Sequence, residues 1–282
     1  MPHPMKGLPP DLHIHTAYCG HATGTMEESV LAAMGKGLDE IGFSDHFPYP
    51  PDFDAPAPDC VIPTVEAFES YAEEVRRLRS AYRGRIDIRF AAEVDFLDGW
   101  WDRQQAMLKP YPFDYVIGSV HIVDGVAIDY REDMLQTKIP DLGGIESAWD
   151  LYWDSLEAMI RRGGFHLLGH LDILKKYPSS ISQRDHTERL RDLCRLLKER
   201  GIVLEVNTGG IDRASDGMPY PSLPALKLAA ETGLDVALGS DAHAPAEVGR
   251  HFREISKRLA ALGWRRTAAF RAGQKHYKQL HL

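Results

Sequence analysis

Apolar runs that end in histidine, aspartate or glutamate recur along the whole 282-residue chain. The first lies in the stretch from Asp11 to His21, and later runs end at His46, Glu93, His121, His170 and the segment Asp241-Ala-His243. Each polar residue lies at or just past the C-terminal end of a predicted strand, where barrel enzymes build their active sites. We therefore expect a sheet whose strand ends converge on one site.

Strands and helices alternate along the chain. After a first strand at the start of the Asp11–His21 stretch, the pattern predicts strands at 40–43, 86–90, 115–120, 165–168, 202–206 and 234–238. Helical periodicity separates most of them, beginning with a capping box at Thr25 and Glu28 and including helices at 223–232 and 246–262. Strands alternating with helices imply a parallel sheet, and converging polar ends favour closure. We predict one α/β domain over residues 1–282, a TIM-like seven-stranded (β/α)7 barrel.

Composition narrows the class of protein. The formal net charge of -8 disfavours nucleic-acid and anionic-membrane partners, since no Lys/Arg cluster offsets it. Three widely spaced cysteines, Cys19, Cys60 and Cys194, do not suggest a disulfide framework. Residues 1–10 lack the apolar core of a signal peptide, and no apolar run reaches membrane-spanning length. We expect a cytoplasmic protein.

Two long connections lack apolar periodicity. The first, residues 47–63, is rich in proline, and we interpret it as an irregular loop. It is either a lid over the barrel mouth, where Asp52, Asp54 and Asp59 could meet a cationic substrate, or a solvated acidic loop. The second covers residues 124–144, and a short strand or tail ends the chain.

The stretch Asp11-Leu-His-Ile-His has metal-binding spacing. His13 and His15 point to the same face of a strand and can bind one ion with little left to immobilise. Chance histidines or a structural metal site are the alternatives. Seven of the thirteen histidines lie at predicted strand ends, whereas a structural site needs only about four ligands. We interpret His166 as a core histidine and assign no role to His3, His186, His251, His276 and His281.

Taken together, these blocks resemble the PHP (polymerase and histidinol phosphatase) family over nearly the whole chain. The segments Cys-Gly-His-Ala, Ser-Asp-His, Tyr-Val-Ile-Gly-Ser-Val-His, Gly-His-Leu-Asp and Gly-Ser-Asp-Ala-His look like its histidinol-phosphatase branch. The resemblance implies a distorted seven-stranded barrel and three divalent transition-metal ions, which could be Zn, Fe or Mn.

The resemblance also implies the ligands. The first metal would be held by His13, His15, Glu93 and Asp241, the second by Glu93, His121 and His170, and the third by His21, His46 and His243. Glu93 would bridge the first two metals, and Glu93, Asp241 and His243 would be catalytic. Cations that share a carboxylate lower the pKa of a bridging water and supply hydroxide for attack on phosphorus.

Other polar residues lie near these ligands in the sequence. Asp11, Asp45 and Asp172 could orient imidazole N–H groups or could cap turns. Arg213 and Lys175 are candidate phosphate contacts, although such residues are often solvated.

The expected function is metal-dependent hydrolysis of L-histidinol phosphate, a small phosphomonoester, in histidine biosynthesis. Alternatives are a PHP enzyme acting on nucleotides or oligonucleotide ends, which would want a basic groove, and a non-catalytic metal-binding regulator, which would have lost ligands. An amidohydrolase-type enzyme would want a bridging lysine at a strand end, and none is present. The sequence leaves the metal identity and the oligomeric state open.

Overall fold

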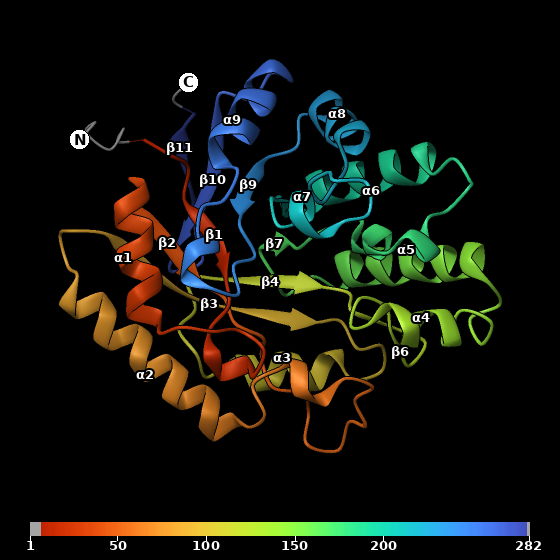
Figure 1. Cartoon of the computed structure of the whole chain (residues 1–282), viewed down its shortest axis with the longest axis horizontal. Coiled ribbons are helices and arrows are strands. Elements are labelled where there is room, and N and C mark those ends of the chain that lie inside the picture. Colours follow the sequence, from red (N-terminus) through yellow and green to blue (C-terminus); the bar gives the residue numbers. More distant parts are fainter. Residues whose placement is uncertain (1–6, 281–282) are drawn as a thin grey trace.

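The computed structural model describes residues 7–280, and a closed barrel of parallel strands lies at its centre (Figure 1). Its seven strands follow the order β1-β2-β3-β4-β7-β8-β9, and β9 returns to β1 through the pairing of Asp11 with Leu238. The strands are β1 (Asp11–Ile14), β2 (Glu40–Phe43), β3 (Asp87–Asp95), β4 (Tyr115–Ser119), β7 (Leu167–Leu168), β8 (Val203–Asn207) and β9 (Val236–Gly239). The predicted seven-stranded α/β barrel is confirmed.

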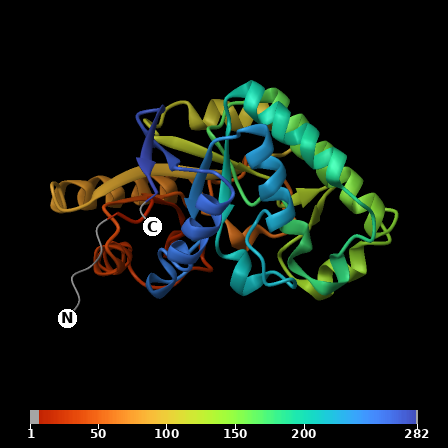
Figure 2. The same cartoon turned by 90° about the horizontal axis from the view of Figure 1, so that it is seen from above.

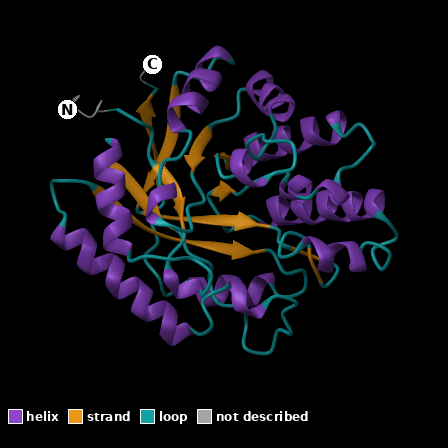
Figure 3. Cartoon of the chain, in the orientation of Figure 1, coloured by secondary structure: helices purple, strands orange, loops and turns teal. Residues whose placement is uncertain are grey.

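Helices surround the barrel, as Figures 2 and 3 show. The predicted capping box forms at the start of the first of them, because the Thr25 side chain accepts from the Glu28 amide and Glu28 accepts from the Thr25 amide. Among residues 7–280, no helix has both the length and the apolar character that a membrane crossing requires. The helices are α1 (Met26–Lys36), α2 (Val65–Ala81), α3 (Trp101–Leu108), α4 (Glu132–Lys138), α5 (Ile145–Arg162), α6 (Thr187–Arg200), α7 (Gly210–Arg213), α8 (Leu223–Thr232) and α9 (Phe252–Ala261).

Several boundaries differ from the sequence prediction. The connection at 124–144 contains α4 and, with residues just before it, the two-stranded hairpin of β5 (Ile122–Val123) and β6 (Val126–Ala127). The helix predicted from residue 246 begins only at Phe252, because Pro245 opens a separate 3-10 turn. The predicted C-terminal strand or tail is a hairpin of β10 (Arg266–Arg271) and β11 (Gln274–Gln279).

The inward side chains change character along each barrel strand. On β3, Ala91 belongs to an apolar cluster inside the barrel, whereas Glu93, two residues further, belongs to the polar site described below. On β8, Val203 and Glu205 show the same change. Since residues two apart in a strand share a face, the barrel interior is apolar at the N-terminal end and polar at the C-terminal end.

The β10–β11 hairpin packs against the apolar end. Ala268, Ala269 and Phe270 join the inner apolar cluster, which includes Leu12, Tyr115, Ile117, Leu167 and Ala237. The hairpin turn is fixed to the start of β4, because the Ala272 amide donates to the Asp114 carboxylate at 2.8 Å. The hairpin therefore covers the N-terminal end of the barrel.

Candidate metal and active site

Strand β1 supplies two buried histidines to the polar end of the barrel. His13 and His15 are 0% and 4% exposed, and their Nε2 atoms lie 3.1 Å apart. The Nδ1 atom of His13 lies 2.6 Å from a Glu205 carboxylate oxygen, which favours a proton on Nδ1 and directs Nε2 into the site. The predicted two-residue spacing thus brings both imidazoles to one site.

Glu93 lies at the centre of the cluster. One of its carboxylate oxygens accepts a hydrogen bond from Ser119 at 2.6 Å and lies 2.8 Å from His170 Nε2. Its other oxygen is buried without a hydrogen-bond partner, 3.3 Å from His13 Nε2 and 3.2 Å from His46 Nδ1. An unpaired buried carboxylate oxygen is costly unless it contacts a cation.

The ends of β4 and β7 supply a second histidine pair. His121 and His170 face each other with their Nε2 atoms 3.0 Å apart. Asp95, at the end of β3, contacts His121 Nδ1 and also accepts a hydrogen bond of 2.5 Å from the Tyr49 hydroxyl. The His121 ring is therefore oriented by a carboxylate in the same way as the His13 ring.

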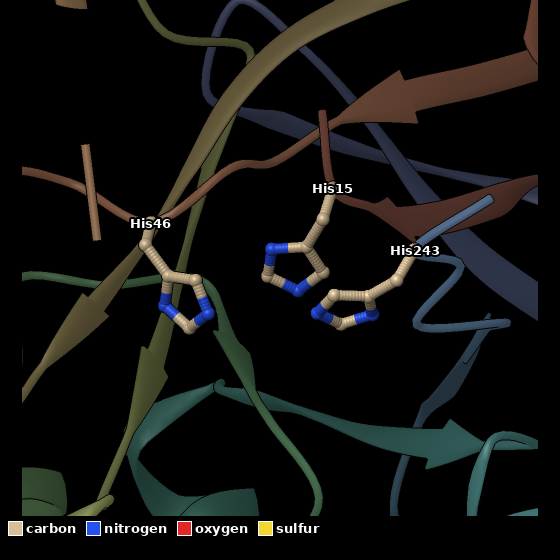
Figure 4. A group of neighbouring side chains, drawn as sticks. All are labelled: His15, His46 and His243. Carbon is tan, nitrogen blue, oxygen red and sulfur yellow. The ribbon is translucent and has the colours of Figure 1, made fainter. Parts of the chain in front are cut away.

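The rim of the site carries the remaining predicted ligands. Figure 4 shows His15, His46 and His243 with their rings turned toward one another. His21 does not join this group of three, but its Nε2 atom lies 2.9 Å from that of His243. Asp241 Oδ1 lies 3.2 Å from His15 Nε2. All nine predicted ligands are thus gathered at one end of the barrel.

These contacts fit divalent transition metals. Facing imidazole nitrogens that both carry lone pairs repel each other unless a cation or a proton lies between them. Several groups of imidazole and carboxylate donors have ligating atoms that all lie within 4.8 Å of one another. One group is His13, His15 and Glu93, and another is Glu93, His121 and His170. Because Glu93 belongs to both groups, the cluster could hold more than one ion.

The pKa values of the buried groups also indicate a site that favours positive charge. Burial alone lowers the pKa of His13, but the carboxylates of Glu205 and Glu93 outweigh it and raise the pKa to about 10. Burial likewise lowers the pKa of His121, and Asp95, with other carboxylates, raises it to about 10. Burial raises the pKa of Glu93, but the surrounding histidines, His13 first, hold it well below its ordinary value. The site therefore attracts positive charge.

For His46 and His243, at the rim of the site, burial outweighs the nearby carboxylates in setting the pKa. Burial is the main reason why the pKa of His46 lies well below its ordinary value, and burial also lowers the pKa of His243. Both imidazoles are therefore neutral at neutral pH, the form in which histidine binds metals.

A cavity of about 380 Å³ opens onto the cluster. Its polar lining contains Glu93, Asp95, Asp241 and all the predicted histidine ligands except His13. Its remaining lining includes Ala57, Val61, Ile122, Ala127 and Ile173, with Asp129 and several tyrosines. The 47–63 loop contributes Tyr49, Ala57, Cys60 and Val61 to this lining. The loop therefore covers part of the cavity, whereas its predicted motion as a lid stays a prediction.

The two predicted phosphate contacts lie in different places. Arg213 lines the cavity, and its buried Nε atom has no hydrogen-bond partner. Lys175 does not line the cavity, and its ammonium donates to Asp216 at 3.1 Å and to the Pro219 carbonyl at 2.8 Å. This arrangement argues against the predicted role of Lys175, because the ammonium is already engaged.

The three aspartates beside the ligands have separate roles. Asp45 lies 3.3 Å from His15 Nδ1 and orients that ring. Asp11 accepts from the Ser240 and Gly249 amides. Asp172 accepts from the Ser222 amide at 2.9 Å. The first is an imidazole partner, and the other two stabilise turns.

Sequence reasoning missed two carboxylates. Glu205 interrupts the apolar run Val203-Leu-Glu-Val, and a glutamate at an inward strand position is the signal that could have identified it. Gly239 makes room for it, since a Cβ atom at that position would lie 2.0 Å from Glu205 Oε1. Asp95 follows Glu93 by two residues on the same face of β3, which is a comparable signal.

The remaining histidines lie outside the cluster. His166 accepts a hydrogen bond of 3.1 Å from the Val116 amide, as predicted, but it is only partly buried and is not a full core residue. His186 stacks on Trp149, and His251 contacts Asp212 on the surface. His276 lies 3.5 Å from Glu40, on the C-terminal hairpin. His3 and His281 lie outside the described residues.

Comparisons with known proteins agree with this architecture. The PHP domain family model matches residues 11–209, and the PHP-associated family model matches residues 222–261. A probable histidinol-phosphatase of Deinococcus radiodurans is 35% identical, with 93% of this chain and 96% of the relative covered. The histidinol-phosphatase of Bacillus subtilis is 30% identical, with 88% and 98% covered.

Solved structures share the fold. A candidate histidinol phosphatase from Listeria monocytogenes superposes with a TM-score of 0.80 at 25% identity, covering 87% of this chain and 99% of that chain. The histidinol phosphate phosphatase of Lactococcus lactis, complexed with Zn, L-histidinol and phosphate, also gives 0.80, at 21% identity, covering 95% and 98%. The fold of this chain is thus shared with experimentally determined structures.

Proposed function

The chain belongs to the PHP domain family, and on this basis we propose that it is a metal-dependent phosphomonoesterase that converts L-histidinol phosphate to L-histidinol and phosphate. The observation that carries the proposal is a cavity lined by eight of the nine predicted metal ligands, in a chain 35% identical to a probable histidinol-phosphatase. We place the reaction in histidine biosynthesis, and expect it in the cytoplasm, in keeping with three free cysteines.

We propose three cation positions. His13, His15, Glu93 and Asp241 would hold the first, Glu93, His121 and His170 the second, and His21, His46 and His243 the third. The first two sets are supported by donor groups that already converge in the structure. The third is supported by the contact between the Nε2 atoms of His21 and His243. Zinc is one candidate, since a zinc complex exists for the Lactococcus lactis enzyme of the same fold.

When bound, such cations polarise phosphoryl oxygens and activate water as a nucleophile at neutral pH. The chain contributes orientation. Glu205 and Asp95 hold the His13 and His121 rings through Nδ1, so that both Nε2 atoms point into the site. Asp45 holds His15 in the same way. These pairs remove the need to reorganise the rings during the reaction.

Arg213 is positioned to bind a phosphate oxygen. Its guanidinium contacts the main-chain carbonyl of Asp241 and lies 3.1 Å from the Asp241 carboxylate. The residue lines the cavity, and its buried Nε atom has no hydrogen-bond partner among the described residues. A phosphate oxygen would satisfy the arginine with a charge-assisted hydrogen bond.

A phosphate-release panel tests the proposal. Protein reconstituted with Zn, Fe or Mn is given L-histidinol phosphate, a nucleoside monophosphate or a short oligonucleotide with a terminal phosphate. We expect kcat/KM to be highest for L-histidinol phosphate. Preference for either nucleotide would replace the proposed substrate, and absence of turnover with all three metals would favour a non-catalytic regulator.

A further inference from the structure

Asp129 occupies the cavity wall just beyond the β5–β6 hairpin. The hairpin follows His121 directly, and the Ile128 amide donates to the His121 carbonyl at 2.9 Å. The Asp129 carbonyl accepts hydrogen bonds from Lys176 Nζ at 2.6 Å and from the Tyr177 hydroxyl at 2.8 Å. The Asp129 carbonyl is therefore fixed by two donors, and the residue lines the cavity.

The other acidic groups of the wall are already engaged. Each of them contacts a histidine, an arginine or a backbone amide: Glu93 with His170, Asp95 with His121, Asp241 with Arg213, and Glu247 with the His243 amide. By contrast, within residues 7–280 the Asp129 carboxylate accepts no hydrogen bond, and its one ion-pair partner is Lys176, whose Nζ lies 3.6 Å away. Nor does Asp129 belong to any group of donors close enough to share a metal ion.

The carboxylate is ionised and close to the polar cluster. Burial raises the pKa of Asp129, but the charges of Lys176 and of His121 outweigh it and lower the pKa below the ordinary value. The side chain is 20% exposed, so a bound group can reach it from the cavity. The apolar side chains of Ile122 and Ala127 line the wall beside it.

We propose that Asp129 binds the ammonium group of the substrate, an inference that rests on the proposed function. In L-histidinol phosphate the amino group lies on the carbon next to the one that carries the phosphate ester. A carboxylate that recognises it must therefore lie beside the phosphate-binding cluster, as Asp129 does. The neighbouring apolar side chains can contact the rest of the substrate. The anionic phosphate then lies at the metal-binding cluster, and the cationic ammonium lies at Asp129.

The test compares esters that differ only in the amino group. The first pair is L-histidinol phosphate and imidazolylpropyl phosphate, which has hydrogen in place of the amino group. The second is phosphoethanolamine and ethyl phosphate. Binding to metal-loaded protein is measured by calorimetry and phosphate release by kcat/KM. Wild type is expected to prefer the amine-bearing member of each pair by about 10- to 100-fold, the range of a hydrogen bond between charged groups.

The D129N variant should abolish this preference by weakening only the amine-bearing esters, mainly through Kd and KM. The control D124N alters an exposed aspartate in the turn of the same hairpin and should preserve the preference. Equal binding of both members by wild type would overturn the proposal even if D129N did not fold. So would equal losses for both members in D129N.

The two pairs separate this inference from the proposed function. If L-histidinol phosphate is neither bound nor hydrolysed, the proposed function fails. The proposal for Asp129 is then tested by the second pair alone. It predicts that D129N loses the preference for phosphoethanolamine over ethyl phosphate, and a preference that survives the substitution overturns the proposal.

Discussion

The two ends of the barrel are built from the same strands but have opposite chemistry. At the N-terminal end, Leu12, Ala91 and Tyr115 pack with the C-terminal hairpin into a small apolar core. At the C-terminal end, histidines and carboxylates lie side by side, and His13, His170 and Glu93 are among those that are buried. Burial of apolar surface stabilises the N-terminal end, whereas the charged groups buried at the C-terminal end are stable only when cations or protons compensate them.

This contrast implies that the two ends have different roles, one in stability and the other in binding. The N-terminal end, here called the base, serves packing alone, since the cavity does not open there. The C-terminal end, here called the mouth, holds polar groups whose arrangement serves binding. Substitutions at the mouth should therefore affect activity and metal content more than folding, and substitutions at the base should do the reverse. The predictions below test that separation, in order of decreasing expected effect.

The largest effect is expected for Glu93→Gln at the mouth. The amide keeps the shape but cannot serve as an anionic donor between the two histidine groups, so kcat should fall about 1,000-fold or more, about 4 kcal/mol. Phosphate release, metal content and a thermal melt measure the three consequences. The exposed control Glu73→Gln should be unchanged, and near-normal turnover in the Glu93 variant would contradict the central role of this carboxylate.

The next is Phe270→Ala at the base. Phe270 is 3% exposed and its ring centroid lies 5.6 Å from that of Tyr115, so its removal should lower the free energy of unfolding by about 3 kcal/mol. Urea unfolding measures the loss, with Leu31→Ala, on an exposed face of α1, as the control. Metal content and kcat below the melting range should stay at the wild-type level. A parallel loss of metal would show that the two ends are coupled.

Glu205→Gln should have a smaller effect at the mouth. Glutamine can still contact His13 but no longer supplies the charge that keeps the proton on Nδ1, so metal affinity should fall by about 10- to 100-fold. Competition with a chelating dye measures affinity independently of turnover. Glu199→Gln on the exposed side of α6 is the matched control. Unchanged metal affinity in the Glu205 variant would show that the ring is positioned by packing alone.

The smallest effect is expected for Lys275→Ala on the hairpin. Its ammonium lies 2.7 Å from Asp235, but both side chains are about one-third exposed, at 31% and 33%. Exposed ion pairs contribute little, so the free energy of unfolding should fall by less than about 1 kcal/mol, and less still at high salt. A loss comparable to that of Phe270→Ala would mean that the hairpin is held by charge rather than by apolar packing.

Much of the site was predictable because its ligands obey local rules. The two-residue spacing of His13 and His15 and the position of Glu93 on the face opposite Phe90 follow from strand geometry alone. The convergence of strand ends follows from a parallel barrel. The partners of the ligands were less accessible, because the contact between His13 and Glu205 joins residues 192 positions apart in the chain.

The sequence by itself determined the alternation of strands and helices, the residue types at each strand end and the capping box at Thr25 and Glu28, since these depend on neighbours within a few residues. Only the tertiary structure decided that the last hairpin covers the N-terminal end of the barrel and that the Lys175 ammonium donates to Asp216. It also decided that the Asp129 carboxylate lies beside the cluster with Lys176 as its ion-pair partner. Those outcomes depend on contacts between residues that lie far apart in the sequence. A local pattern of apolar and polar residues does not specify such contacts.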